Sequence, residues 1–533
     1  MSIPRWNPDS SLTRQEQMLM KRLGRTRKLF GFLRLHRHEL FDDAFQVELE
    51  AAYRDTGAGK SPTSPALMAM AMLLQGYVGA SDAEAVELTV VDLRWQMVLS
   101  RLGRTKPAFS QGALVEFRAR LIAHDLDRRL LERTVEVARK TNEFDWRKLP
   151  KTLRVAIDSS PLVGAGRVED TFNLLGHAAR KIVVCAAAIL DSTVDKVCRE
   201  AGIPMLLESS VKRALDVQWS DLSQKASAFD DLIGQIDSLE RWLTKHLRDE
   251  MTKPPLDKAV KTLAQLRAQD LEPDPTTGKT RIREGVAEDR RVSIEDPEMR
   301  HGRKSKSKLF NGYKRHIATD VDSDLILACG MTPANRPEDE AIPALKADIS
   351  RQGITIDELF IDRGYIKSPL VDHIIKSGGE VYCRPWVPRN GDLFSKEAFT
   401  LNMRDMTITC PAGQTEKIAL GTTVEFNADD CGLCLMRRKC TTARRSKGRT
   451  VSIAQDERLQ QRLRRRAATP AGRRQLRVRT VVEHRLAHIS RRQGRRARYC
   501  GTRKNLLDLR RAAAIQNLET IHRQLGVEVR IAA

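Results

Sequence analysis

Two aspartates stand where predicted β-strands end. Residues 153–158 form a short apolar run that finishes in Asp158, and residues 358–362 form a second run that finishes in Asp362. Catalytic groups gather where strands end along one edge of an α/β sheet, so the two carboxylates are candidates for one site. An aspartate at a strand end is also a common turn residue or helix N-cap, and each aspartate taken singly fits that reading equally well.

A third carboxylate, Glu483, lies in a predicted helix that is otherwise intensely basic. The run at 477–485 reads RVRTVVEHR, with Glu483 as its acid. The simple explanation is an i,i+4 ion pair with Arg479, which is worth only about 0.2–0.5 kcal/mol. The functional explanation is that three carboxylates from two strands and a helix bind Mg²⁺ through hard oxygen ligands, while nearby arginines hold phosphates.

The charge of the whole chain favours a polyanionic partner. The 533 residues include 92 Lys and Arg against 69 Asp and Glu, which gives a net charge of +23 and a pI near 9.8. Such a protein attracts nucleic acid, with an anionic membrane as the second candidate. The longest apolar runs, 67–74 and 182–190, are shorter than the ~20 residues that span a bilayer. We therefore expect double-stranded DNA as the partner and no membrane.

The cysteine content indicates a reducing compartment. Nine cysteines, an odd number, occur in a chain whose first residues carry no apolar signal core, which argues against a disulfide framework. We expect a cytoplasmic, nucleoid-associated protein.

Four of these cysteines lie within a short segment rich in glycine and proline, and they are Cys410, Cys431, Cys434 and Cys440. Four thiols with one C-x-x-C pair can form a tetrahedral structural Zn²⁺ site. The alternative is four independent thiols in an irregular insertion, because only one of the two usual C-x-x-C pairs is present.

The periodicity of apolar residues divides the chain into six expected segments. They are a helical N-terminal DNA-binding domain at 1–150, the start of a catalytic core at 151–200, a helical insertion and linker at 201–300, the remainder of the core sheet at 301–390, an insertion with the zinc site at 391–460, and a C-terminal catalytic helix with a basic tail at 461–533. A helical oligomerisation domain is the alternative for residues 1–150.

The core elements follow one another in the order strand, strand, strand, helix, strand, helix, strand. The strands are expected at 153–158, 312–320, 325–332, 358–362 and 381–384, with helices opened by Pro337 and Pro369. This is the order of an RNase-H-like mixed sheet, so the expected fold class is α/β. A helical hairpin at 220–271 interrupts it after the first strand, and its apolar stripe predicts a packing or dimer-contact element. The polar segment 272–308 is expected to be a loop or linker.

A basic run covers residues 462–511, with only two acids, Glu483 and Asp508. Such a run is expected to follow a DNA backbone. His484 and His488 lie one helical turn apart within it, and we interpret them as a phosphate-contacting or packing pair rather than metal ligands.

The motifs around the three carboxylates resemble those of insertion-sequence DDE transposases, and the resemblance covers most of the chain. The motifs are AIDSSP at 156–161, FIDRGY at 360–365, the helix from Arg479 to Glu483, HGRKSKSKLFNGYKRH at 301–316, and the Gly- and Arg-rich blocks at 494–499 and 501–505. The resemblance implies an enzyme whose catalytic residues Asp158, Asp362 and Glu483 bind two Mg²⁺ or Mn²⁺ ions.

The resemblance also implies a reaction and its partners. The protein would bind the terminal inverted repeats of an insertion sequence and carry out metal-dependent DNA cleavage and strand transfer into target DNA, as a homodimer on DNA. The candidate DNA-binding residues in the basic motifs are Arg303, Lys304, Tyr313, Lys314, Arg479, Arg491, Arg492, Arg495 and Arg496.

Two positions depart from the resemblance. Related enzymes often carry a Tyr before the Arg and a Lys two turns after the Glu, whereas this chain has Leu476 and Ser490 there. Arg491 and Arg492 are the candidates to replace that Lys, although a guanidinium and an ammonium group are not interchangeable at a phosphate.

Two other functions fit the same sequence. One is a metal-dependent nuclease on the same fold, which cuts DNA without joining it. The other is a catalytically inactive DNA-binding regulator derived from a transposase, although such a protein has no use for three clustered carboxylates. A serine nucleophile is disfavoured because Ser159 and Ser160 have no His near them in the sequence.

Overall fold

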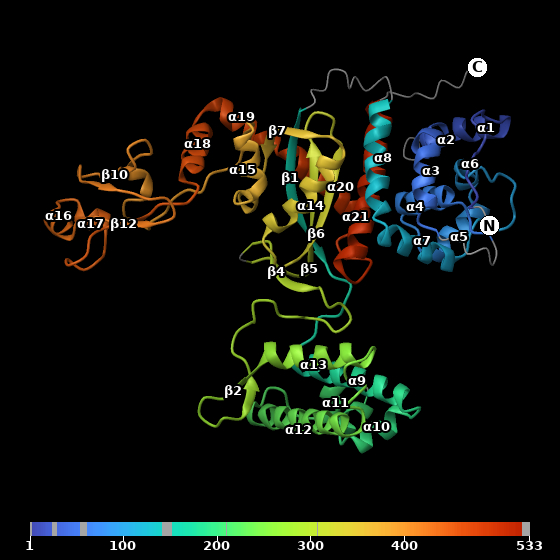
Figure 1. The fold of residues 1–533 in the computed structure, drawn as a ribbon, viewed down its shortest axis with the longest axis horizontal. Helices are drawn as coiled ribbons and strands as arrows, with labels where there is room; N and C mark the ends of the chain where they lie inside the picture. Colours follow the sequence, from blue (N-terminus) through green and yellow to red (C-terminus); the bar gives the residue numbers. More distant parts are fainter. Residues whose placement is uncertain are drawn as a thin grey trace.

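A six-stranded mixed sheet forms the centre of the fold (Figure 1). Its central strand β1 pairs antiparallel with β5 on one side and parallel with β7 on the other. Beyond β7 lies β8, and β4 and β6 share the far edge of β5. The strands are β1 (Thr152–Val163), β4 (Arg300–Arg303), β5 (Leu309–Asp320), β6 (Ile326–Pro333), β7 (Thr355–Phe360) and β8 (Glu380–Tyr382). The predicted α/β class is confirmed.

The computed structural model describes residues 3–23, 29–53, 61–140, 152–208, 210–305 and 307–524. The expected domain boundary between residues 150 and 151 lies outside these ranges.

The first strand is longer than the sequence predicted. The Ser-Ser-Pro run was expected to end it after Asp158, yet β1 continues to Val163. Parallel pairing with β7 reaches Ala156, while pairing with β5 continues to Val163. Pro161 has no N–H to donate, and it is tolerated because β7 no longer flanks this end of β1.

Helices cover both faces of the sheet, as alternation of side chains along the strands requires. On one face, Val155 and Ile157 pack with α14 (Ile342–Arg351) and α15 (Pro369–Lys376). On the other face, Ala156 belongs to a larger core. That core is completed by α8 (Leu126–Lys140), α20 (Thr480–Gln493), α21 (Thr502–Gln524) and the N-terminal helices.

The N-terminal region is helical, as predicted. Its helices are α1 (Arg14–Arg22), α2 (Leu29–Leu40), α3 (Asp43–Glu50), α4 (Pro65–Val78), α5 (Asp82–Val91), α6 (Leu93–Val98) and α7 (Gln111–Ala123). Pro65 stands at the first position of α4, and the Ser110 hydroxyl accepts a hydrogen bond from the Ala113 N–H at the start of α7. Both residues are local signals of a helix start.

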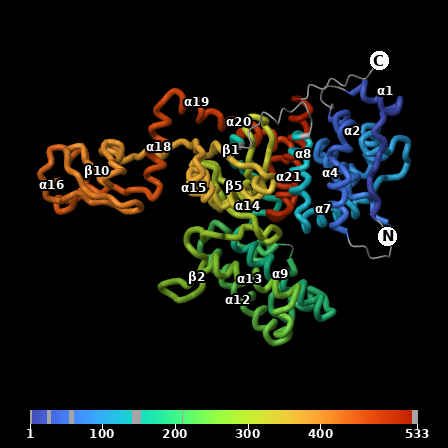
Figure 2. The backbone as a smooth tube through the Cα atoms, turned by 45° about the horizontal axis from the view of Figure 1, so that its top comes forward, coloured from blue at the N-terminus to red at the C-terminus, as the bar shows by residue number. Residues whose placement is uncertain are grey.

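The end of the chain is not a basic tail within the described residues. Residues 502–524 form α21, whose side chains are largely buried between α8 and the sheet (Figures 1 and 2). Arg510 and Arg511 are each 5% exposed. These arginines therefore act inside the protein, and the expected basic run does not follow DNA over its whole length.

A separate helical unit lies between β1 and β4 in the sequence. The predicted hairpin is confirmed as α12 (Leu222–His246) and α13 (Leu256–Asp270). Its apolar stripe packs on α9 (Thr171–Ile189), so the stripe is covered within its own unit and needs no dimer partner. The unit also contains α10 (Val194–Glu200) and α11 (Val211–Leu215). Among the described helices, α9 alone has the length and apolar composition of a membrane span, and 56% of that stretch is buried inside the protein.

The segment expected to be a linker is partly ordered into short strands. Residues 272–308 include most of β2 (Leu271–Pro273), all of β3 (Thr280–Ile282) and β4, which joins the central sheet.

The cysteine-bearing segment projects from the sheet on the side opposite the N-terminal helices (Figure 2). It has a small apolar core of its own. Its elements are β9 (Thr400–Asn402), β10 (Thr407–Thr409), β11 (Thr415–Lys417), β12 (Thr423–Glu425), α16 (Ala428–Leu433), α17 (Arg437–Cys440) and β13 (Thr450–Ser452), and α18 (Glu457–Ala468) and α19 (Pro470–Val478) lead back to α20.

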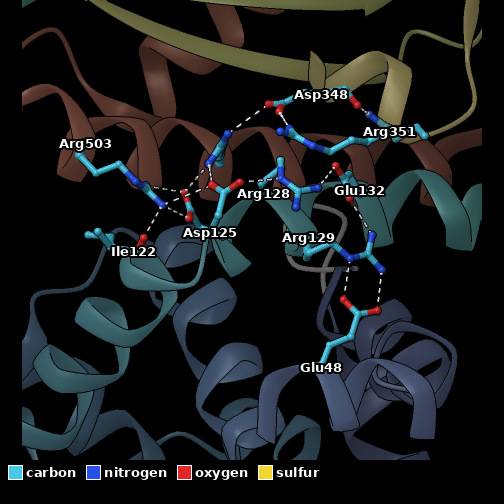
Figure 3. Close-up of polar contacts among 12 residues, drawn as sticks. Glu48, Ile122, Asp125, Arg128, Arg129, Glu132, Asp348, Arg351 and Arg503 are labelled. Atoms are coloured by element: carbon cyan, nitrogen blue, oxygen red, sulfur yellow. Dashed lines mark hydrogen bonds and ion pairs between the residues drawn. The ribbon is translucent and has the colours of Figure 1, made fainter. Parts of the chain in front are cut away.

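A buried network of charges joins α21 to α8 and α14 (Figure 3). The Arg510 guanidinium contacts Asp125 at 2.7 Å, Asp127 at 3.1 Å and Asp348 at 3.1 Å. Asp127 and Asp348 are 2% and 5% exposed. A buried charge is costly without its partner, so this network links the N-terminal helices, the C-terminal helix and the sheet in one body.

We predict that Arg510→Met destabilises the protein by about 3–5 kcal/mol, because it leaves carboxylates buried without their counter-charge. Arg351→Met is the matched control. Arg351 contacts the same Asp348 at 2.7 Å but is half exposed, so its loss should cost no more than about 1 kcal/mol. Urea unfolding followed by circular dichroism measures both, and equal effects of the two variants would contradict the role of the network.

Candidate active site

The register of β1 and β7 places Asp158 and Asp362 side by side. Ala156 lies opposite Phe360 in the parallel pair, and each aspartate follows two residues later. Asp362 also caps the short 3-10 helix η4 (Arg363–Tyr365), accepting a hydrogen bond from the Arg363 N–H at 2.7 Å. The simple N-cap reading is therefore correct for Asp362 as well, and it fixes the carboxylate at the strand end.

Helix α20 brings Glu483 to the same place. Arg479, just before this helix, donates to Asp158 Oδ2 at 2.8 Å and to Glu483 Oε1 at 2.5 Å. The i,i+4 pair considered from the sequence is present, and the same guanidinium extends it to β1. Arg479 thus ties the third carboxylate to the first across 321 residues of chain.

The three predicted carboxylates line one cavity of about 490 Å³. Its wall also carries Arg303, Lys304, Lys314 and Arg479, which are four of the predicted DNA-binding residues. The structure therefore brings the predicted acids together and surrounds them with cations that suit a phosphate backbone.

A fourth carboxylate, Glu338, lines the cavity and was not found from the sequence. It opens the 3-10 helix η3 (Glu338–Ala341) after β6, and its Oε1 accepts a hydrogen bond from the Ser159 hydroxyl at 2.5 Å. A Cβ added to Gly364 would lie 2.1 Å from Glu338 Oε2, so a larger residue there would force the Glu338 carboxylate to move. The sequence offers no signal that separates Glu338 from the adjacent Asp339 and Glu340.

The gathering of acids changes the acidity of Asp158. The pKa of its carboxyl is raised to about 6, chiefly by burial and also by the negative charges of Asp362 and Glu338. Arg479 and the Ser159 N–H act in the opposite direction, because they stabilise the ionised form. A buried carboxyl with other acids beside it is a place where a bound cation would be favourable.

A buried polar pair supports the strand ends from behind. Nδ1 of His316 lies 2.8 Å from the Tyr365 hydroxyl, and Nε2 lies 2.9 Å from Thr332 Oγ1. Burial lowers the pKa of His316 to about 3, so the imidazole is neutral. Tyr365 follows Asp362 by three residues, and this pair therefore fixes the turn that carries the second aspartate.

One predicted DNA-binding residue is misplaced. The Tyr313 side chain is fully buried, and its hydroxyl donates to the Asp296 carboxylate at 2.5 Å. Tyr313 alternates with Lys314 along β5, so the strand turns the tyrosine into the core and leaves the lysine at the cavity. Tyr313 is therefore a core residue and is withdrawn from the DNA-contacting set.

Ser490 and the two arginines after it do not supply the cation that related enzymes place near the catalytic Glu. Ser490 lines the cavity and accepts a hydrogen bond at 2.9 Å from the buried guanidinium of Arg315. Arg491 and Arg492, expected to replace the missing lysine, line another cavity on the other side of α20. The expectation for these two arginines is wrong, because helical geometry turns them away from the carboxylates.

The remaining predicted DNA-binding residues differ in exposure. Arg495 and Arg496 are exposed after α20, and Arg491 is exposed on it. Arg492 is partly buried and paired with Glu519 at 2.7 Å.

The four cysteines of the projecting segment line one cavity of about 560 Å³. The pKa of the Cys440 thiol is raised, first by burial and then by the proximity of Cys431, Cys410 and Cys434. In the ranges that the structure describes, no three His, Cys, Asp or Glu side chains are arranged to hold a metal ion. The four thiols lie around one cavity but are not close enough together to form a metal site. At the carboxylate cavity, the Arg479 guanidinium lies between Asp158 and Glu483 and bonds to both.

Comparison with protein families identifies the class of protein. The family model "Transposase DDE domain" matches residues 405–522, and the model "Transposase domain (DUF772)" matches residues 27–120. These two matches indicate an insertion-sequence DDE transposase. The first match contains Glu483 and does not extend to Asp158 or Asp362. Comparison with curated proteins and with solved structures gives no match.

We predict that Mn²⁺ affinity is greatest well above pH 6 and falls as the pH drops through about 6, because protonated Asp158 cannot bind a cation. Glu338→Gln removes one negative neighbour, so the pKa of Asp158 falls and the loss shifts to lower pH. Calorimetric Mn²⁺ titrations at a series of pH values give the midpoint.

The matched control for this measurement is Glu340→Gln, an exposed acid on the same 3-10 helix that does not line the cavity. It should keep the midpoint of the unmodified protein. A common midpoint for both variants would show that Glu338 does not act on Asp158.

Proposed function

We propose that this transposase binds the terminal inverted repeats of an insertion sequence and catalyses metal-dependent DNA cleavage and strand transfer, with Asp158, Asp362 and Glu483 as its catalytic triad. The observation that carries the proposal is the convergence of these carboxylates, from β1, β7 and α20, in one cavity whose wall also bears basic side chains. The matches to two transposase family models support this reaction class.

The same proposal includes an RNase-H-like core. Three strands joined antiparallel, β6, β5 and β1, are followed across the sheet by the parallel strands β7 and β8. The catalytic helix α20 then lies against β1 and β5. In this arrangement the helical unit at 171–270 and the cysteine-bearing segment at 391–460 are insertions, and residues 1–150 form the domain that binds the inverted repeats.

The cavity has the donor set that a divalent metal needs. Hard carboxylate oxygens suit Mg²⁺ or Mn²⁺. Burial, together with the charges of Asp362 and Glu338, raises the pKa of Asp158, and a bound cation would stabilise its ionised form. Asp158, Asp362 and Glu483 would hold the ions, which supply an activated water and stabilise the leaving 3′ oxygen.

The residues of the chain then have separate tasks. Arg479 neutralises Asp158 and Glu483 in the metal-free protein. When cations take over that task, its guanidinium becomes available to a phosphate, for which its planar fork is well suited. Arg303, Lys304 and Lys314 hold the DNA backbone at the mouth of the cavity.

A metal-dependent nuclease is the second candidate, because the same cavity would cut DNA. The two functions differ only in whether the cleaved DNA end is then joined to target DNA. The protein, Mn²⁺ and a labelled fragment with the flanking inverted repeats should yield both cleaved ends and strand-transfer products. Cleaved ends without joined products would favour the nuclease.

We predict that Asp158→Asn, Asp362→Asn and Glu483→Gln each reduce cleavage at least about 10³-fold while inverted-repeat binding remains, since each removes a metal-binding oxygen. Asp372→Asn is the control, because Asp372 is exposed on α15 and does not line the cavity. Gel assays of cleavage and fluorescence anisotropy of binding measure the two properties. If one of these three variants were fully active, its residue would not belong to the triad.

We also propose that Cys410, Cys431, Cys434 and Cys440 hold a structural Zn²⁺. The four soft donors line one cavity, and the segment that carries them has only a small core to stabilise it. Small units of this kind commonly depend on a metal or disulfide.

The prediction from this site concerns metal content. Mass spectrometry of the native protein should find one Zn²⁺ per chain, which is lost in the double variant Cys431→Ser, Cys434→Ser. The exposed Cys500→Ser is the control and should retain the metal. A metal-free unmodified protein would refute the zinc site.

Assembly and location follow from the proposed reaction. Cutting and joining two ends requires two active sites, so we propose a homodimer on DNA and a nucleoid-associated, cytoplasmic protein.

A further inference from the structure

The catalytic helix α20 separates two cavities. Glu483, Leu486, Ala487 and Ser490 line the carboxylate cavity. The opposite face of the helix lines a second cavity of about 670 Å³ with Arg485, His488, Arg491 and Arg492. An α-helix with its side chains is about 10–12 Å across, so one helix diameter separates the two cavities.

The second cavity lies at the junction of three parts of the fold. Its other walls are the end of α4, from Gly76 to Gly79, the start of α2 at Leu29, and α21 with Gln516, Glu519, His522 and Arg523. The N-terminal helices, the catalytic helix and the central helix α21 therefore meet around this space.

The second cavity carries an excess of positive charge. Four arginines line it against one carboxylate, that of Glu519. Arg485 is paired with Asp324, and Arg492 is paired with Glu519. Within the described part of the chain, Arg491 and Arg523 have no carboxylate within ion-pair distance. Arg523 donates from Nε to the Glu519 carbonyl oxygen at 3.4 Å and from Nη2 to Thr520 Oγ1 at 3.2 Å. A guanidinium has five N–H donors, so Arg523 and Arg491 both retain donors for an anion.

The pKa of His488 reflects the positive charge of the second cavity. Its pKa is lowered, first by burial and then by the positive charges of Arg491, Arg485 and Arg523. These arginines approach the imidazole from α20 and α21, and Glu519 is the carboxylate that opposes them. The space enclosed by these residues is electropositive.

A buried amide lines the second cavity without a partner. Gln516 on α21 is 3% exposed, and neither its Oε1 nor its Nε2 has a hydrogen-bond partner among the described residues. An unsatisfied buried amide costs about 1–3 kcal/mol, so its presence calls for a group that completes it. The Nε2 can donate to an anionic oxygen.

We propose that the second cavity binds a phosphate group of the DNA backbone, held by Arg491, Arg523 and Gln516. Guanidinium groups match phosphate oxygens with paired N–H donors, and the amide supplies a further N–H. DNA is the occupant because the cavity opens beside the helices that are proposed to bind the inverted repeats, on the reverse side of the helix that carries Glu483. The inference rests on the proposed function and adds a specific phosphate site to it.

The site has a consequence for the reaction. One helix would contact DNA on both faces, through its catalytic carboxylate and through this phosphate site. A DNA end held at the second cavity would fix where α20 lies, and so how the scissile phosphate meets Glu483.

The test measures binding of a fluorescent inverted-repeat duplex as a function of salt. Arg491→Ala and Arg523→Ala should each weaken binding and reduce the slope of log K against log salt by about 0.9, the value for one phosphate contact. Gln516→Leu should weaken binding severalfold with an unchanged slope, because the amide is neutral. The control Arg241→Ala, an exposed arginine on α12, should change neither quantity.

A second measurement locates the phosphate and separates DNA from a small anion. Ethylation of single phosphates should identify one position that weakens binding of the unmodified protein and has no further effect in Arg491→Ala. Inorganic phosphate and ATP are added to the unmodified protein and to Arg491→Ala in thermal denaturation. A stabilisation confined to the unmodified protein, with an unaltered DNA salt slope in the variants, would overturn the proposal in favour of a small-anion site.

The outcomes for the two levels of inference are distinct. Unmodified protein that cleaves and joins inverted-repeat DNA, with variants that bind as tightly and with the same slope, would overturn this inference alone. Unmodified protein that binds no inverted-repeat DNA would overturn the proposed function and this inference together. Because Arg491 is exposed, its variant keeps the test informative even if Gln516→Leu fails to fold.

Discussion

The burial of carboxylates close to one another is the constraint on which this structure depends. Asp158, Asp362, Glu338 and Glu483 come from four elements and line one cavity, and burial adds to the cost of ionising Asp158. In the metal-free protein that cost is offset by Arg479, which bonds to two of the four acids. Apolar side chains would pack at lower cost than four neighbouring carboxylates, and this cost supports the proposed cation-dependent reaction.

The frame that holds these acids together is set by the helix at the end of the chain. Helix α21 lies between the sheet and the N-terminal helices, and Arg510 binds carboxylates from both sides of it. The buried arginines of α21, Arg510 and Arg511, are paired with carboxylates instead of being solvated. Helix α20 packs against α21, so the position of Glu483 depends on the same interior contacts. The N-terminal helices therefore share packing partners with the element that carries Glu483.

Basic residues in this chain divide into structural and surface groups, although they look alike in the sequence. Arg315 and Arg510 are buried, and they hold elements together through their side-chain donors. Arg303 and Lys304 remain exposed beside the carboxylates. The net charge indicated DNA as the partner, but burial decides which basic side chains can contact it.

The sequence by itself determined the fold class, the order of five of the six strands of the central sheet and the two aspartates Asp158 and Asp362, because apolar runs and helix caps are local signals. The third carboxylate, Glu483, was found as a lone acid in a basic helix. Tertiary structure alone decided the rest. It added Glu338, buried Tyr313 and turned Arg491 to the opposite face of α20. These outcomes depend on strand register and helix rotation against distant elements, which no local pattern records.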